Sequence, residues 1–267
     1  MAQQQHVRLK REIRFAPDGP ELPSSAANTY AANPPWAGVG PVLCLAAIIE
    51  SPIDPSTGMM VNIKDVDRIL REIAFEIFTH APGANRSTGV GNLLLDCYHK
   101  CAQAFLPRTF LGLQLSPSPW ARFEIHQKEI PMVRMSLRFE FAAAHRLHCD
   151  NLDQRHNLEL FGKCNSPNAH GHNYELEVVL AGKPDRSTGL VLPIGEFQQI
   201  VNTHVIREFD HKHLNLDCPE FAKLNPTVEN IAQVIFDKLH KAFHAPAELK
   251  GVRVWETPKT CCEVLAE

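Results

Sequence analysis

The sequence predicts an α+β protein that contains two copies of one arrangement of strands and helices. The pentapeptide Asp185-Arg-Ser-Thr-Gly189 repeats Asp54-Pro-Ser-Thr-Gly58 at an offset of 131 residues (185 − 54). At the same offset, the apolar residues of 194–209 repeat those of 63–78, and both segments have the spacing of an amphipathic helix. Because strand, turn, helix, helix and strand recur in the same order, we interpret the two halves as homologous domains.

Local patterns predict the elements of the first half. Alternation of apolar and polar residues indicates a strand over 8–15, and a continuous apolar run indicates a buried strand over 42–49. The segment between them, 17–41, is rich in Pro, Gly, Ala and Ser, which is typical of irregular structure. The remaining elements expected here are helices over 63–78 and about 90–105 and strands over 111–115 and 121–127.

The second half is predicted to repeat this layout. Strands are expected over 137–144, 174–180 and 252–256, and helices over 194–209 and 227–243. Thr227 has the residue type and position of an N-cap, with Glu229 in the first turn of the helix that follows. We expect the boundary around Pro131, which gives domains of residues 1–130 and 134–267.

Composition and charge narrow the class of protein. The 267 residues are 44% hydrophobic and 21% charged, with a net charge of −3, which is ordinary for a soluble globular protein. This balance favours neither a general nucleic-acid partner nor a membrane-surface role. No apolar run approaches the roughly 18 residues that span a bilayer. The N-terminal residues lack the layout of a secretory signal, so the expected compartment is the cytoplasm.

Cysteine and histidine are distributed differently along the chain. The eight cysteines form no Cys-x-x-Cys pair, which argues against a thiolate zinc finger or a thioredoxin-type site, and free thiols are expected. Of the 14 histidines, only His6, His80, His99 and His126 precede residue 134. Histidine chemistry is therefore expected in the second half.

Three histidines of the second half form a candidate metal site. His170 and His172 alternate at the start of a predicted strand, so both imidazoles would point to the same face. His145 ends the strand predicted over 137–144 and is the best third ligand, since a catalytic zinc ion takes three protein ligands and keeps one position open. His148 and His156 compete for this role, and we interpret them as solvated loop residues.

Further side chains could act beside such a metal. Cys164, in a loop before His170, is either a buried small hydrophobe or a base or nucleophile near the metal. Asp210 and His211 are adjacent, an arrangement in which a carboxylate can orient an imidazole, although charged helix ends often have the same composition. Glu256, on the last predicted strand, is either a solvated edge residue or a carboxylate that accepts two parallel N–H groups from a ring.

The first copy lacks these residues. At the offset of 131, His170 and His172 fall on Val39 and Pro41. Glu124 is the one polar residue of interest that it retains, and we match it to Glu256. The first domain is therefore predicted to be a scaffold without metal ligands.

The second half resembles the 6-pyruvoyl-tetrahydropterin synthase family, which includes the 6-carboxy-tetrahydropterin synthases. The resemblance extends from about Arg138 to Glu256 and is carried by Phe141-Ala-Ala-Ala-His145, the stretch Leu160 to Tyr174, Asp210-His-Lys-His-Leu214, Thr227-Val-Glu-Asn230 and Trp255-Glu-Thr257. It implies the tunnelling fold, or T-fold, in which an antiparallel four-stranded sheet carries two helices on one face and subunits assemble into barrels. The chain would then be a tandem of two such domains.

The resemblance also assigns roles to the site residues. It implies Zn²⁺ on His145, His170 and His172, a catalytic group of Cys164, Asp210 and His211, a pterin anchor at Glu256, and a pterin pocket lined by Thr227 and Glu229. The implied reaction is that of a carbon–oxygen lyase, which converts 7,8-dihydroneopterin triphosphate to 6-pyruvoyl-tetrahydropterin with loss of triphosphate. The expected partner is a small pterin substrate, with no nucleic acid and no membrane.

Two other functions stay open. One is a 6-carboxy-5,6,7,8-tetrahydropterin synthase of queuosine biosynthesis, a carbon–carbon lyase. Members of that branch usually have three residues between the cysteine and His-Gly-His, whereas five separate Cys164 from His170, as in the pyruvoyl-forming branch. The other is a non-catalytic homologue that binds pterin or metal. Active sites of the family lie between subunits, so we expect a homo-oligomer. In a trimer of tandem chains, the first domains would form one ring and the second domains another, and we expect this assembly.

Overall fold

The computed structural model describes residues 5–17, 41–79 and 89–266 and divides the chain into two compact units. Unit 1 comprises residues 1–135 together with 182–191, and unit 2 comprises residues 136–181 together with 192–267. The predicted irregular segment 17–41, which includes Val39, lies almost wholly outside the described residues. Each unit contains an antiparallel sheet and helices, which confirms the predicted α+β class.

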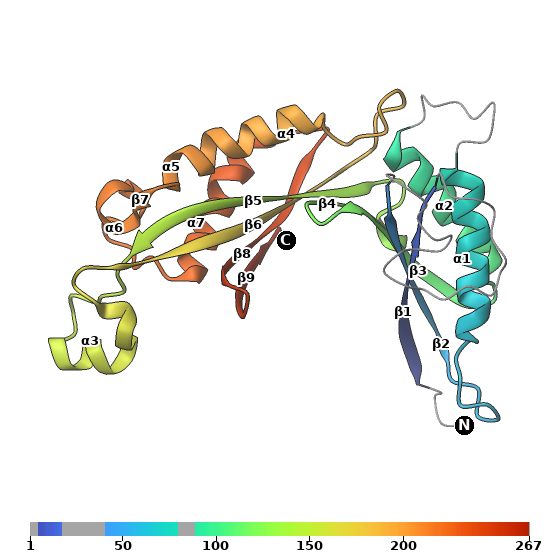
Figure 1. The fold of residues 1–267 in the computed structure, drawn as a ribbon, viewed down its shortest axis with the longest axis horizontal. Helices are drawn as coiled ribbons and strands as arrows, with labels where there is room; N and C mark the ends of the chain where they lie inside the picture. The colour runs from blue at the N-terminus through green and yellow to red at the C-terminus, as the bar shows by residue number, and fades with distance from the viewer. Residues whose placement is uncertain (1–4, 18–40, 80–88, 267) are drawn as a thin grey trace. The chain divides into compact units, whose positions relative to one another are not determined.

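The described part of unit 1 holds four antiparallel strands and two long helices (Figure 1). Its strands are β1 (His6–Phe15), β2 (Leu43–Pro52), β3 (Thr109–Ser118) and β4 (Ala121–His126), paired in the order β1-β2-β3-β4. The helices α1 (Ile63–Phe78) and α2 (Val90–Ala104) contact each other, and α1 contacts β1 while α2 contacts β3 and β4. A short 3-10 turn, η1 (Gln127–Glu129), follows β4.

The core of unit 1 follows from the periodicity of its sequence. On β1 the alternate residues Ile13 and Phe15 are fully buried. On α1 the residues at helical spacing are buried against them, and the rings of Phe15 and Phe78 lie 5.9 Å apart. Burial of each such side chain contributes about 1.5–3 kcal/mol. Asn62 caps α1, because its side chain accepts a 2.9 Å hydrogen bond from the Lys64 N–H.

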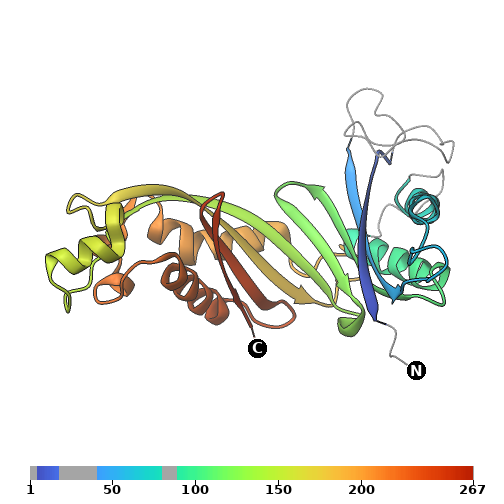
Figure 2. The same ribbon diagram turned by 90° about the horizontal axis from the view of Figure 1, so that it is seen from below.

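The longest described strands, β5 (Val133–His145) and β6 (His170–Gly182), belong almost wholly to unit 2 and lie side by side in Figures 1 and 2. With β8 (Glu248–Thr257) and β9 (Thr260–Leu265) they form the order β5-β6-β8-β9, and the two-residue β7 (Lys212–His213) pairs in parallel with β5. The helical segments of this unit are α3 (Gln154–Phe161), η2 (Gly162–Asn165), α4 (Ile194–Val201), η3 (Asn202–Ile206), α5 (Arg207–Phe209), α6 (Leu214–Asp217), η4 (Pro219–Phe221) and α7 (Val228–Ala242). Helix α7 packs on β8, β9, α4 and η3.

The helix predicted over 194–209 is present but is not regular. Its middle segment, η3, is a π-helical turn in which the Arg207 N–H donates to the Asn202 carbonyl, five residues back. The matching helix of unit 1, α1, is α-helical throughout its 16 residues. Single π turns inside α-helices are frequent at functional sites. This one ends four residues before Asp210.

Most predicted elements are found, and the structure adds elements that were not predicted, among them α3, α6, β7 and β9. Strand β9 is an edge strand with exposed residues in alternation, so it lacks the continuous apolar run that identifies a buried strand. Among the described residues, no helix is both long and apolar enough to cross a lipid bilayer.

Candidate functional site

Three imidazoles converge where β5 ends and β6 begins. One ring-nitrogen atom from each of His145, His170 and His172 lies within 4.8 Å of the others. The closest pair is His145 Nε2 and His170 Nε2, at 3.1 Å. Alternation on β6 gives His170 and His172 the same face, and β5 delivers His145 to that face as its last residue. The structure therefore brings the three predicted metal ligands together.

The tautomer of His145 is fixed by a backbone carbonyl. His145 is fully buried, and its Nδ1–H donates a 2.7 Å hydrogen bond to the Pro226 carbonyl. Its Nε2 therefore presents a lone pair toward the other two rings, as a metal ligand must. Burial lowers the pKa of His145, and the neighbouring His170 lowers it further, although the bond to Pro226 acts in the opposite direction. Burial and His172 also lower the pKa of His170.

The geometry and the chemistry of this set fit a metal ion. In a tetrahedral zinc site with Zn–N bonds of about 2.0–2.1 Å, two ligand nitrogens lie about 3.3 Å apart. The 3.1 Å separation of the His145 and His170 nitrogens is close to this value. Neutral imidazoles, which the lowered pKa values favour, are the form that binds metal. The three histidines can therefore hold a metal ion.

Glu256 lies beside this imidazole cluster. Its Oε1 is 3.4 Å from His145 Nε2 and 3.8 Å from His172 Nε2, and its side chain is 20% exposed. The residue lies near the end of β8, whose residues Val252 and Val254 are buried in the core with the same alternation. The carboxylate therefore borders the cluster and remains partly open to a ligand.

The loop that carries Cys164 is fastened to the chain just after His145. The Leu147 N–H donates to the Cys164 carbonyl at 2.9 Å. The buried Asn165 donates through its side chain to the Leu147 carbonyl at 2.7 Å. Cys164 is partly exposed, and its thiol lies close enough to Tyr174 to contribute to that residue's raised pKa, after burial and Glu256. These two hydrogen bonds therefore place Cys164 near the end of β5, where His145 lies.

Thr227 and Glu229 lie at the N-terminus of α7. Thr227 is the N-cap and accepts a 3.4 Å hydrogen bond from the Asn230 N–H, as predicted. It directly follows Pro226, so this helix end is tied to the cluster through the carbonyl that binds His145. Glu229 is exposed, and after burial its charge is the largest contribution to the raised pKa of Cys262 on β9. No hydrogen bond joins Glu229 to the imidazoles in the described part of the chain.

Asp210 and His211 are held by the backbone of one residue on β5. Asp210 Oδ1 accepts from the Ala142 N–H at 2.8 Å, and the His211 N–H donates to the Ala142 carbonyl at 2.6 Å. Asp210 Oδ2 lies 2.9 Å from His211 Nδ1. The bond from Ala142 and then the imidazole lower the pKa of Asp210. His211 has φ = 56°, a left-handed conformation that is unfavourable for a residue with a Cβ.

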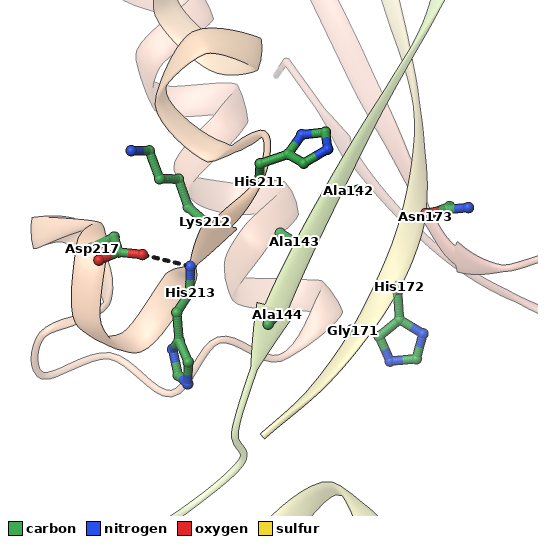
Figure 3. A pocket seen from close by; sticks show the side chains of 10 residues that line it. All are labelled: Ala142, Ala143, Ala144, Gly171, His172, Asn173, His211, Lys212, His213 and Asp217. Carbon is green, nitrogen blue, oxygen red and sulfur yellow. Dashed lines mark hydrogen bonds between the residues drawn. The ribbon is translucent and has the colours of Figure 1, made fainter. Parts of the chain in front are cut away.

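His211 borders a groove whose lining includes one residue of the imidazole cluster, His172 (Figure 3). Its lining combines alanines of β5, residues 171–173 of β6 and polar side chains in and beside β7: Ala142, Ala143, Ala144, Gly171, His172, Asn173, His211, Lys212, His213 and Asp217. In Figure 3 the His172 ring projects from the far side of β6, away from Lys212 and His213. The His211 side chain is 84% exposed, whereas His145 is fully buried. Within one chain, His172 and His211 line the same groove, but no described hydrogen bond or ion pair joins the predicted acid–base pair to the cluster.

His148 and His156, the other candidates for the third metal ligand, are not part of the imidazole cluster. His156 is exposed on α3. His148 is not a solvated loop residue as predicted: its Nδ1 lies 3.0 Å from the Asn165 side-chain amide and 3.3 Å from an Arg146 guanidinium nitrogen. Its role is to connect the loop that carries Cys164 to the end of β5.

Comparison with known proteins covers the unit that holds this site. Residues 134–267 match the family described as 6-pyruvoyl tetrahydropterin synthase. The 6-pyruvoyl tetrahydrobiopterin synthase of Drosophila melanogaster is 41% identical over 129 residues, which are 48% of this chain and 77% of that protein. The enzyme of the same name from Homo sapiens is 40% identical over 46% of this chain and 85% of its own length. A solved 6-pyruvoyl tetrahydropterin synthase from Caenorhabditis elegans is 36% identical, covers 51% of this chain and 97% of its own, and superposes with a TM-score of 0.49.

The chain belongs to the 6-pyruvoyl tetrahydropterin synthase family. All nine predicted site residues lie within the matched range. Glu124, which the sequence match paired with Glu256, lies outside it.

The pairing of Glu124 with Glu256 is wrong. Glu124 on β4 pairs with Gln114, two residues beyond Gly112. The residue in the same place of the other sheet is Glu263, which pairs with Arg253, two residues beyond Gly251. The sequence match compared the segment of β4 with that of β8. By strand pairing, however, β4 takes the place of β9, and the match missed this because β9 was not predicted.

Sequence reasoning missed two groups that shape this family site. The Pro226 carbonyl sets the His145 tautomer, and a backbone group carries no signal in a sequence. Tyr174, four residues after His170, is fully buried beside the cluster. Its position on the face of His170 and His172 follows from alternation and could have identified it.

Proposed function

We propose that this chain is a zinc-dependent pterin synthase that converts 7,8-dihydroneopterin triphosphate to 6-pyruvoyl-tetrahydropterin with loss of triphosphate. The observation that carries the proposal is the convergence of His145, His170 and His172 with Glu256 inside the unit that matches the family. Imidazole-only ligand sets suit zinc, and three protein ligands leave a position open to substrate.

The residues divide the chemistry among them. The three imidazoles would hold a zinc ion, which would act as a Lewis acid on the substrate side chain and make its carbon-bound hydrogens more acidic. Cys164 takes and returns a proton on that side chain. Asp210 holds the His211 ring through its 2.9 Å contact, so that His211 exchanges protons in a fixed orientation. Glu256 binds the N–H edge of the pterin ring, and Thr227 and Glu229 line the pocket at the start of α7.

The active site is proposed to be composite, with Cys164 and His211 from different copies of the chain. The backbone of Cys164 is bonded to Leu147, two residues after His145, while His211 is exposed over the groove of Figure 3. A second copy that places its groove over the cluster would complete the catalytic group. This supports a homo-oligomer, and a trimer of tandem chains is the proposed assembly.

We further propose that the chain is a tandem of two T-fold domains, 1–130 and 134–267. Both sheets have a register shift at the same place: between Ile48 and Ile49 in the β2–β3 ladder, and between Val179 and Leu180 in the β6–β8 ladder. The strand residue opposite each shift is a glycine, Gly112 or Gly251. A Cβ at either glycine would lie 2.7 or 2.8 Å from a carbonyl oxygen of the next strand, which accounts for the shared residue type.

The first domain is proposed to lack both metal and pterin ligands. Glu256 lies five residues after Gly251, and the residue five positions after Gly112 is Pro117. Pro117 has no carboxylate that could bind a pterin ring. The proposed metal ligand His170 corresponds to Val39 at the sequence offset of 131. This domain would then line an active site or contact neighbouring domains in the oligomer, without supplying a catalytic residue.

Product identification tests the reaction. The zinc-loaded protein is incubated with 7,8-dihydroneopterin triphosphate, and products are identified by mass spectrometry. The expected products are 6-pyruvoyl-tetrahydropterin and triphosphate. Formation of 6-carboxy-tetrahydropterin would move the chain to the carboxy-forming branch, and no product would make it a binding homologue. Cys164→Ala should abolish turnover and keep the metal, while Cys44→Ala, a cysteine on β2 of unit 1, should stay active.

Subunit complementation tests the composite site. Cys164→Ala and His211→Ala are each expected to be inactive. When the two variants are unfolded and refolded together, mixed oligomers should recover part of the activity, because some sites receive an intact Cys164 and an intact His211 from different chains. Absence of recovery, with mixed oligomers demonstrated by mass, would contradict a site shared between chains.

A further inference from the structure

Tyr174 has a buried hydroxyl that no described protein group satisfies. The residue is 0% exposed, and its hydroxyl oxygen has no hydrogen-bond partner among the described residues. Its ring is stacked on Phe141 at 5.0 Å and meets His145 and His172 at 6.2 and 5.7 Å. A buried hydroxyl without a partner costs about 1–3 kcal/mol. Such a group, beside a candidate site, is available to a bound ligand or to a residue that moves when the ligand binds.

Glu256 is a neighbouring acceptor that can change its partner. The β6–β8 ladder pairs Glu175 with Trp255, and one further step of this antiparallel register places Tyr174 opposite Glu256. Side chains that are directly opposite share a face, with Cβ atoms about 4.5–5.5 Å apart. The carboxylate now lies against His145 and His172, at 3.4 and 3.8 Å. The phenol and the two imidazoles therefore compete for the same carboxylate.

This competition has a consequence for the proposed function. If Glu256 stays against the imidazoles, it becomes an additional metal ligand and closes the position that the substrate needs. If it turns away, it can accept the two N–H groups of a pterin ring, and a third donor then fixes its orientation.

We propose that Tyr174 is a positioning residue for Glu256, whose phenol O–H donates to the carboxylate and holds it toward the pterin ring and away from the metal. The inference rests on the proposed function, because it needs Glu256 to anchor a pterin. It assigns the phenol a bond that forms with ligand binding, so the hydroxyl contributes to affinity and not to the stability of the free protein.

The test is Tyr174→Phe in the full-length, zinc-loaded protein, with 7,8-dihydroneopterin as the probe. Its Kd is measured by calorimetry, and the unfolding temperature is measured without pterin. We expect the Kd to rise about tenfold or more, as for loss of a hydrogen bond to a charged group. The zinc content should be unchanged, and the unfolding temperature should equal or exceed that of the wild type.

Tyr98→Phe is the matched control. Tyr98 is also buried, at 3% exposed, but its hydroxyl donates a 3.0 Å hydrogen bond to the Phe110 carbonyl. Its removal leaves a buried carbonyl without its partner, so this variant should unfold at a lower temperature and bind the probe normally. The two substitutions remove the same atom, but Tyr174→Phe should weaken binding without loss of stability, and Tyr98→Phe should lower stability without loss of binding.

A second variant tests whether Tyr174 acts through Glu256. In a Glu256→Gln background, Tyr174→Phe should have much less effect on the Kd. An unchanged Kd for Tyr174→Phe, or an equal rise in both backgrounds, would overturn the inference and leave the proposed function intact. A lowered unfolding temperature with a normal Kd would make the hydroxyl merely structural. If the wild-type protein does not bind 7,8-dihydroneopterin, the proposed function itself fails.

Discussion

Asp54 and Asp185, which are 131 residues apart, close the same turn with the same hydrogen bonds. The carbonyl of each accepts from a glycine N–H at 2.8 Å, from Gly58 in one turn and Gly189 in the other. The side chain of each accepts a 2.6 Å bond from a serine hydroxyl and a further bond from that serine's N–H. The repeated pentapeptide therefore encodes a repeated local structure.

The turn at Asp185 should make stability depend on pH under acidic conditions. Hydrogen bonds from Ser187 and Thr188 lower the pKa of Asp185 to about 2. Because the folded pKa lies below the unfolded value of about 3.9, the turn contributes fully above that value and loses its contribution as pH falls toward 2. We expect Asp185→Asn to flatten the fall in urea midpoint between about pH 4 and pH 2. Asp54→Asn should act in the same direction, since hydrogen bonds from Ser56 also lower the pKa of Asp54. Full pH dependence in both variants would contradict this account.

Backbone conformation predicts opposite effects for two glycine substitutions. Gly58 has φ = 69°, and a Cβ there would meet no atom within 4 Å, so Gly58→Ala should destabilise by backbone strain alone, by about 1–2 kcal/mol. Gly195 lies in α4 with equally open space, and Gly195→Ala should stabilise by about 0.5–1 kcal/mol. Chemical denaturation of both variants checks the two signs, and the same sign for both would refute the argument.

The sequence was most informative where side chains repeat with a regular period. The strand and helix cores, the Thr227 cap and the convergence of His145, His170 and His172 could all be predicted, because alternation and helical spacing determine which side chains share a face. Strand β9 could not, since it is an edge strand with alternating exposure. The π turn before Asp210 could not be predicted either, because the apolar spacing of 194–209 equals that of the regular α1. The placement of Asp210 and His211 over a groove depends on backbone bonds to Ala142, which leave no trace in residue types.

The left-handed backbone of His211 predicts a separation of stability from activity. At φ = 56° a glycine is favoured over any residue with a Cβ, by about 1–2 kcal/mol. His211→Gly should therefore be more stable than His211→Ala, although both variants lose the imidazole and should be inactive. The comparison uses urea unfolding and triphosphate release. Equal stability of the two variants would show that this conformation carries no strain.

Loss of one imidazole should release the metal. His145→Ala removes the buried ligand, and metal content measured by mass spectrometry after dialysis should fall from one ion per chain to a trace, because two imidazoles bind zinc far more weakly than three. His156→Ala is the matched control, since His156 is exposed on α3. A full complement of metal in His145→Ala would place the metal elsewhere.

The most direct test of the central claim is a zinc titration of the metal-free protein, with triphosphate release from 7,8-dihydroneopterin triphosphate as the readout. We predict no release without metal and a linear rise that ends at one zinc ion per chain, since the described residues hold one such cluster, His145, His170 and His172. Full release from the metal-free protein, or a rise that continues to two zinc ions per chain, would contradict the account.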